Sequence, residues 1–118
     1  LVDAPVHEGA AVLGDVRIPV PSSAGYRVVV GVRPESWELV GEHAGGLRLT
    51  VELIEELGAE SFVYASAPNA DGQWTTSSGR ISVRVDRKLS VALAETVRLK
   101  PVLDELFFFD SATGLRLS

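Results

Sequence analysis

The sequence predicts an all-β domain, built as a small antiparallel barrel or sandwich. Two patterns support this. Apolar and polar residues alternate with period two over many short segments, and the connections between them are rich in Gly, Ser, Asn, Asp and Pro. With 118 residues, 46% of them hydrophobic and 23% charged, the chain is long enough for one core. We therefore expect residues 1–118 to form a single domain.

The first predicted strands differ in their patterns. Residues 16–20 alternate apolar and polar side chains, and prolines within and after them favour an edge strand. Residues 26–32 are a continuous apolar run, which predicts a strand covered on both faces or one that bends at Gly31. Residues 47–53 alternate most clearly. The acidic segment that follows them ends at a turn at Gly58.

The later strands are predicted at residues 61–67, 81–85, 97–100 and 106–110. The last contains three consecutive phenylalanines, at 107–109, so at least one ring must point outward unless both faces are covered. Residues 87–97 are compatible with either a short helix or a loop. Trp74 lies in a polar loop, where it either folds back over the barrel or contacts a partner.

The net charge and the absence of certain residue types exclude several classes of function and of binding site. A formal charge of −5 argues against binding to nucleic-acid phosphates. Without cysteine there is no disulfide or thiolate site, which is compatible with the cytosol but leaves the redox compartment open. The N-terminus lacks a signal-peptide pattern and no apolar run is long enough to span a bilayer. Methionine is absent even at the start, and we expect the segment to be excised from a longer polypeptide.

The search for catalytic motifs predicts no catalytic, cofactor or metal site. His7 and His43 have no second histidine or cysteine at ligand spacing. There is no Gly-x-Ser-x-Gly elbow and no phosphate-binding Gly-x-x-x-x-Gly-Lys loop. Glu55, Glu56 and Glu60 are better explained as a solvated strand end than as paired acids.

The stretch GVRPESW, residues 31–37, combines a cation, a proline, a carboxylate and a tryptophan at a change of direction. Arg33 could form a bidentate pair with Glu35 or with an acid on a neighbouring strand, while Pro34 keeps the preceding residue extended. The corner is either a structural lock or, with Trp37, a contact to another domain or subunit. Phe108 is a further candidate contact.

Three blocks carry a family resemblance: GVRPE at 31–35, VELIEELGAESFVYA at 51–65, and LFFFDSATGLRL at 106–117. In this order and spacing they resemble the C-terminal domain of the maltose/glycerol-phosphate class of ABC importer ATP-binding subunits. The resemblance implies an OB-fold/TOBE-type barrel with a regulatory, non-catalytic role. By the same resemblance Gly58, Asp110 and Gly114 belong to structural turns, and Gly31 and Pro34 are candidate turn residues from the corner itself. The segments PNADGQWTTSSG and VDRKLSVALAETV depart from the family pattern, so partner contacts there are not carried over.

For the parent polypeptide the resemblance implies an ABC transporter ATPase that binds ATP and Mg, since this segment lacks the ATPase motifs. The implied partners are a second copy of the subunit, the parent's ATPase domain, membrane permease subunits and a possible soluble regulator. The implied location is the cytoplasmic face of the cell membrane. The imported solute, a sugar or related compound, is not identified.

Two alternatives belong to other classes of function. A free-standing TOBE-type module could bind a small oxyanion, although the negative charge argues against it. A nucleic-acid-binding OB barrel could stack bases on aromatic side chains, with binding that weakens steeply in salt.

Overall fold

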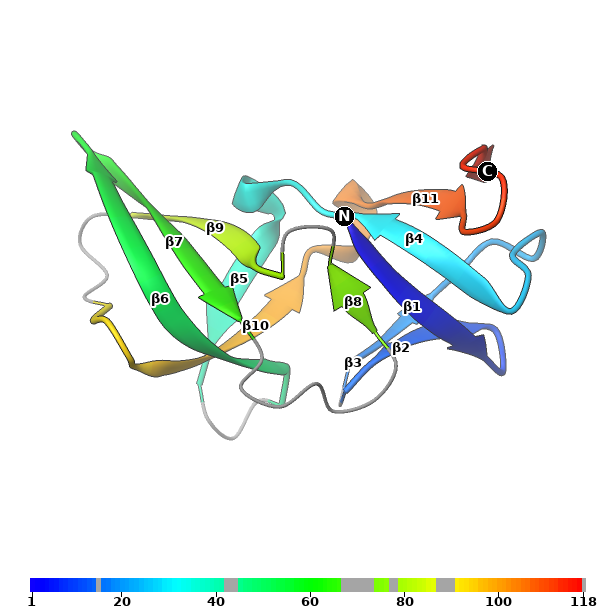
Figure 1. The fold of residues 1–118 in the computed structure, drawn as a ribbon, viewed down its shortest axis with the longest axis horizontal. Helices are drawn as coiled ribbons and strands as arrows, with labels where there is room; N and C mark the ends of the chain where they lie inside the picture. Colours follow the sequence, from blue (N-terminus) through cyan, green and yellow to red (C-terminus); the bar gives the residue numbers. More distant parts are fainter. Residues whose placement is uncertain (15, 42–44, 67–73, 77–78, 87–90, 118) are drawn as a thin grey trace.

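A computed structural model describes residues 1–14, 16–41, 45–66, 74–76, 79–86 and 91–117 of the chain. The described strands pair antiparallel and form two sheets that lie side by side (Figure 1). An all-β fold of short antiparallel strands was predicted from the alternating pattern, and the structure confirms it.

One sheet has seven strands and contains both ends of the chain. Its order is β12-β11-β4-β1-β2-β3, with β8 also pairing with β1. The strands are β1 (Val2–His7), β2 (Ala10–Leu13), β3 (Val16–Pro19), β4 (Arg27–Gly31), β8 (Thr75–Thr76), β11 (Phe107–Asp110) and β12 (Arg116–Leu117). The proline-containing β3 lies at an edge of this sheet, as the sequence predicts.

The other sheet has five strands in the order β5-β10-β6-β7-β9. They are β5 (Trp37–Val40), β6 (Leu47–Leu57), β7 (Glu60–Ser66), β9 (Ile81–Asp86) and β10 (Thr96–Pro101). A short 3₁₀ turn, η1 (Pro34–Ser36), packs against the edge strand β9. Because η1 also leads directly into the opposite edge strand β5, it helps to close the sheet into a barrel-like shape.

Two hairpins have turns whose backbone requires left-handed residues. In β1–β2 the two turn residues, Glu8 and Gly9, have φ values of 51° and 78°. This is the geometry of a type I′ turn, whose twist matches that of the flanking strands. In β6–β7 Leu57 pairs with Glu60, which leaves Gly58 and Ala59 as the turn. Gly58 has φ of 72°, a conformation that glycine adopts without strain.

The core is one apolar cluster to which both sheets contribute. Val28, Val30 and Ile18 come from the seven-stranded sheet, and Leu49 and Leu99 come from the five-stranded sheet. All five side chains are fully buried. Burial of this shared cluster joins the two sheets.

Trp74 and residues 87–97 each had two interpretations. Trp74 is 7% exposed and belongs to the core, so the packing interpretation is confirmed. The helix alternative for residues 87–97 is wrong in its described part, because residues 91–95 form no helix and β10 begins at Thr96. Ala94 donates its N–H to the Val51 carbonyl, and Val51 donates to the Glu95 carbonyl, so the turn pairs with β6 instead. Residues 87–90 lie outside the described residues.

Candidate interaction surfaces

The corner at residues 31–37 joins the two sheets. Arg33 has φ −71° and ψ 152°, the extended conformation that a following proline requires. Ser36 is fully buried, its Oγ donates to Glu105 Oε1 at 2.8 Å, and its carbonyl accepts the Val102 N–H at 2.8 Å. Ser36 thereby fastens the β4–β5 connection to the β10–β11 connection, which contains a second 3₁₀ turn, η3 (Leu103–Glu105).

Arg33 stacks on an aromatic ring. Its guanidinium carbon lies 5.0 Å from the centroid of the Phe107 ring, and that of Arg116 lies 4.9 Å from the same centroid. No ion pair joins Arg33 to Glu35 or to another carboxylate among the described residues, which differs from the expected bidentate pair. A cation over a phenyl ring gains electrostatic attraction without a carboxylate. Glu35 is also exposed and faces a different surface, described below.

The three phenylalanines of β11 divide between the two faces of the sheet. Phe108 pairs with core residue Val30 and packs against the core, whereas Phe107 and Phe109 lie on the opposite face. Gly31 makes room for them. A Cβ on Gly31 would lie 3.4 Å from Phe107 Cβ and 3.5 Å from Phe109 Cε2. The outward rings are therefore Phe107 and Phe109, whereas Phe108, the contact predicted from the sequence, packs against the core.

We call this outer surface the arginine–phenylalanine face. It consists of Leu1, Val29, Arg33, Phe107, Phe109 and Arg116. Leu1 is 65% exposed, and its Cδ2 would lie 3.5 Å from a Cβ on Gly31, beside the two rings. The face combines two cations with aromatic area, and the Asp3 carboxylate, which pairs across from Val29 at its edge, forms an ion pair with Arg27.

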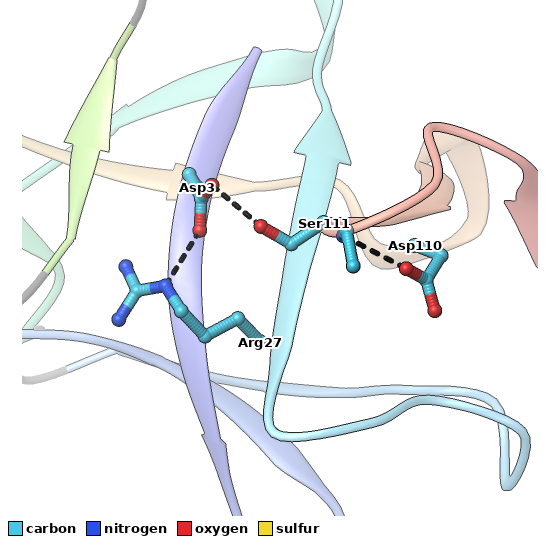
Figure 2. A network of polar contacts seen from close by, with 5 residues as sticks. Asp3, Arg27, Asp110 and Ser111 are labelled. Atoms are coloured by element: carbon cyan, nitrogen blue, oxygen red, sulfur yellow. Dashed lines mark hydrogen bonds and ion pairs between the residues drawn. The ribbon is translucent and has the colours of Figure 1, made fainter.

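A polar network borders this face (Figure 2). Arg27 Nε donates to Asp3 Oδ1 at 2.9 Å, and Ser111 Oγ donates to Asp3 Oδ2 at 2.8 Å, which Figure 2 shows as a bridge from β1 to the C-terminal turn. The Asp3 carboxylate thus has a partner on each oxygen, and its charge is balanced by Arg27. The network fixes the C-terminal turn on β1 without adding net charge to the surface.

Asp110 closes the C-terminal turn through its own side chain. Its Oδ1 accepts the N–H groups of Ala112 at 2.8 Å and Thr113 at 2.9 Å. These backbone donors, with Thr113 contributing most, lower the pKa of Asp110 below its ordinary value. The Asp110 carbonyl accepts the N–H of Gly114, whose φ of 75° suits glycine.

Trp37 lies in the core and is 5% exposed, so its side chain faces the domain interior. Of the four candidate contact residues, Arg33 and Glu35 are exposed, Phe108 packs against the core, and Trp37 is buried. The sequence has no signal that separates Phe107 and Phe109 from Phe108, because residues 28–30 are all valine; the pairing of Phe108 with the buried Val30 sets the direction of the rings.

A second surface lies on the outer side of the β6–β7 hairpin, which extends away from the rest of the molecule (Figure 1). Across β6, β7 and β9 the register forms three rows on one face: Leu53–Tyr64–Ser82, Glu55–Phe62–Arg84 and Leu57–Glu60–Asp86. A bulge between Val51 and Leu53 moves Leu53 to this face. We call these nine residues the acidic hairpin face.

The acidic hairpin face has an apolar centre and charged neighbours. Leu53 is 43% and Leu57 56% exposed, and the half-buried Phe62 lies in the middle row. Tyr64 hydrogen-bonds to Glu55, and this bond is the main reason that the pKa of Tyr64 is raised above its ordinary value. Sequence reasoning treated the acids here as a solvated strand end and overlooked the apolar side chains that alternate with them.

A hollow of about 370 Å³ adjoins this face and reaches the corner. Its lining includes three carboxylates, from Glu35, Glu60 and Asp86, together with Arg84. Arg84 forms an ion pair with Glu60. Three carboxylates and one guanidinium therefore line the hollow.

A different hollow, of about 320 Å³, is lined by Val16, Arg17, Gly45, Gly46, Lys100, Pro101 and Leu103. Because Arg17 and Lys100 line it, this hollow is the candidate site for a small anion. However, Arg17 Nη2 donates to the His7 carbonyl at 3.1 Å. That contact uses one of the five N–H donors of Arg17, and both cations are exposed, so no buried charged group favours an oxyanion there.

The described residues offer no evident catalytic or metal centre. Among them, no group of three or more His, Asp or Glu side chains could hold a metal ion. His7 is exposed beside Glu8, and His43 lies outside the described residues. In the part of the chain that the structure covers, no helix has the length and apolarity needed to cross a membrane.

Comparisons with known proteins point to one family. Residues 1–39 match a family model described as the CysA C-terminal regulatory domain. The chain is 33% identical over 101 residues to the sn-glycerol-3-phosphate import ATP-binding protein UgpC of Cereibacter sphaeroides, covering 86% of this chain and 27% of that protein. It is 29% identical over 140 residues to the diacetylchitobiose uptake system ATP-binding protein MsiK of Streptomyces coelicolor, covering 100% and 36%. The chain thus spans between a quarter and two fifths of these relatives.

Proposed function

Because the chain matches the C-terminal regulatory domain of ATP-binding subunits of ABC importers, we propose that it serves as that domain in an importer of sugars or related solutes. In this role it performs no chemistry. ATP and Mg bind in the ATPase domain of the parent polypeptide, which is held on the cytoplasmic face of the membrane by its permease subunits.

The observation that carries this proposal is how much of the chain the matches cover. Relatives whose names describe import or uptake ATP-binding proteins align with 86% and 100% of it. A chance likeness confined to one hairpin would not extend across both sheets.

We further propose that two copies meet in the transporter and that their contacts differ between its states. A contact that is stronger in one state biases the equilibrium toward that state, in proportion to the difference in free energy. A closed dimer requires the same surface on both copies. The cations and aromatic rings of the arginine–phenylalanine face are suited to this task because Arg and aromatic side chains are favoured at interface centres.

The test is to identify the native polypeptide that carries this segment. An antibody raised against the 12.6 kDa chain is used on whole-cell extract, with retention on ATP resin and fractionation of membranes measured in parallel. We expect a much larger band that binds the resin and sediments with membranes. A band near 12.6 kDa that stays in the supernatant would contradict the proposal.

The regulatory role is tested separately in the assembled transporter. Removing the segment should leave ATP binding intact and change how ATP hydrolysis responds to the transported solute. A transporter without the segment that assembles and responds normally would exclude the regulatory role while leaving the family assignment in place.

A further inference from the structure

The connection between β7 and β9 crosses from one sheet to the other. These two strands are antiparallel neighbours in the five-stranded sheet, where Ala65 pairs with Ile81. A loop of about two to five residues usually joins such neighbours, but here the chain pairs β8 with β1 of the seven-stranded sheet before it returns. In Figure 1 β8 lies beside β1 in the middle of the molecule, where the two sheets meet. Residues 74–76, which we call the β8 latch, therefore link the two sheets.

Few backbone contacts hold the latch on β1. Among the described residues the pairing consists of Val2 with Thr76 and Asp3 with Thr75. Neighbouring pairs in an antiparallel ladder alternate between hydrogen-bonded and not, so one of these two pairs supplies the hydrogen bonds. The same two residues of β1 also pair with β4 on their other side. Release of the latch would therefore leave the ladder between β1 and β4 intact.

The side chains of the latch are buried without all of their hydrogen bonds. Trp74 belongs to the core, and burial of its ring stabilises the closed latch. However, Trp74 Nε1 and Thr76 Oγ1 are both buried with no hydrogen-bond partner among the described residues. Each of these atoms has lost its hydrogen bond to water and gained none in return, which destabilises the closed form. Opening would let water satisfy both atoms and so offset part of the lost apolar burial.

We propose that the β8 latch opens as a unit while both sheets remain folded. Opening exposes the indole of Trp74 and leaves the edge of β1 at Val2 and Asp3 without β8. Short backbone pairing and two unsatisfied buried atoms make this opening easier than global unfolding, as is usual for elements that move in regulation. Its use as a switch rests on the proposed function, because a transporter state that favours one form of the latch shifts its equilibrium.

The test is native-state hydrogen exchange of the chain, followed by NMR. The indole N–H of Trp74 reports opening of the latch, and the amides of Val63 and Ala65, in the interior strand β7, report opening of the five-stranded sheet. After correction for intrinsic rates, we expect the indole to exchange at least about tenfold faster than these amides, with little dependence on low concentrations of urea. Equal rates with the same urea dependence would overturn the proposal, since Trp74 would then leave the core only on global unfolding.

Two threonine variants test the cause of the opening. Thr76→Val keeps the branched shape and removes the buried hydroxyl, so it should slow exchange of the Trp74 indole by about tenfold. Thr75→Val is the matched control, because Thr75 is exposed on the same strand. This control should change the rate by no more than about twofold. Equal effects of the two variants would overturn the unsatisfied Thr76 hydroxyl as a cause of opening.

A disulfide across the same strand pair tests the switch in the assembled transporter. Val2→Cys/Thr76→Cys places cysteines at paired positions, whose usual Cα separation of about 4.5–5.5 Å allows a disulfide. We expect the oxidised form to lose the response of ATP hydrolysis to the transported solute and the reduced form to regain it. An unchanged response in the oxidised form would overturn the switch. It would leave the proposed function in place, because removal of the whole segment tests that function separately.

Discussion

Replacing Ser36 by alanine tests whether the corner holds the two sheets together. Ser36 is fully buried, and its Oγ donates to the Glu105 carboxylate at 2.8 Å. A hydrogen bond to a charged group typically contributes about 1.5–3 kcal/mol. Glu105 is exposed, so water can replace the lost donor and the lower part of this range applies. We expect Ser36→Ala to lower the free energy of unfolding by about 1–2 kcal/mol, or about 4–8 °C in Tm for a domain of this size.

The assay is urea unfolding followed by tryptophan fluorescence, since Trp37 and Trp74 are both buried. Glu105→Ala and the double variant complete a cycle that isolates the pairwise contribution. We expect the two single losses not to add, with a coupling of about 1 kcal/mol. A coupling near zero, with m-values unchanged, would show that the corner is held by the Val102 N–H bond and packing alone.

Three further predictions concern single residues. Ala94 has φ of 65°, which costs an L-residue about 1–2 kcal/mol, so Ala94→Gly should stabilise the domain by up to about 1 kcal/mol. The exposed control Ala92→Gly should not stabilise it, and equal thermal melts would contradict the strain. The lowered pKa of Asp110 adds stability above its unfolded pKa of about 3.9, which is lost as pH falls through the folded pKa. Asp110→Asn should therefore lose less stability than the unmodified chain on acidification below about pH 4, and parallel curves would refute this. The hydrogen bond to Glu55 raises the pKa of Tyr64, so Glu55→Gln should lower that pKa in an NMR titration of the ring.

The stability that Tyr64 contributes is lost as pH rises, whereas the stability that Asp110 contributes is lost as pH falls. Its folded pKa is raised, so the neutral phenol is the favoured form. The corresponding stability is fully present below the unfolded pKa of about 10 and is lost as pH rises through the folded value. An unmodified chain whose stability is flat between about pH 9 and 11, relative to Tyr64→Phe, would contradict the hydrogen bond.

Alternation predicted the strands well because a half-buried strand must place every second side chain in the core. Residues 47–51 and 81–85 follow this rule closely and form parts of β6 and β9. Alternation does not predict β5, because its four residues begin inside the corner, where Trp37 is compatible with either a structural lock or a contact to another subunit. It also left β1 and β2 unassigned, since a Glu-Gly turn is a weaker hairpin signal than Asn-Gly.

The candidate surfaces were harder to predict than the strands. The sequence identified the corner and Arg33, but the direction of each phenylalanine depends on the register of β11 with β4, which no local pattern fixes. The direction of the side chains on the β6–β7 hairpin is also not predictable from a local pattern. The bulge between Val51 and Leu53 reverses which face the later residues occupy, so alternation read straight through β6 places Leu53 and Leu57 in the core.

The corner links the proposed interface to the stability of the domain. Arg33 contributes to one face, Glu35 to the hollow beside the other, and Ser36 between them to the bond with Glu105. If two copies pair through the arginine–phenylalanine face, dimerisation adds contacts beside this bond and stabilises the folded state by mass action. The Tm of the unmodified chain should then rise with protein concentration, whereas that of Arg33→Glu/Arg116→Glu should not. If the Tm of neither chain depends on protein concentration, the corner has a purely structural role and is not part of an interface.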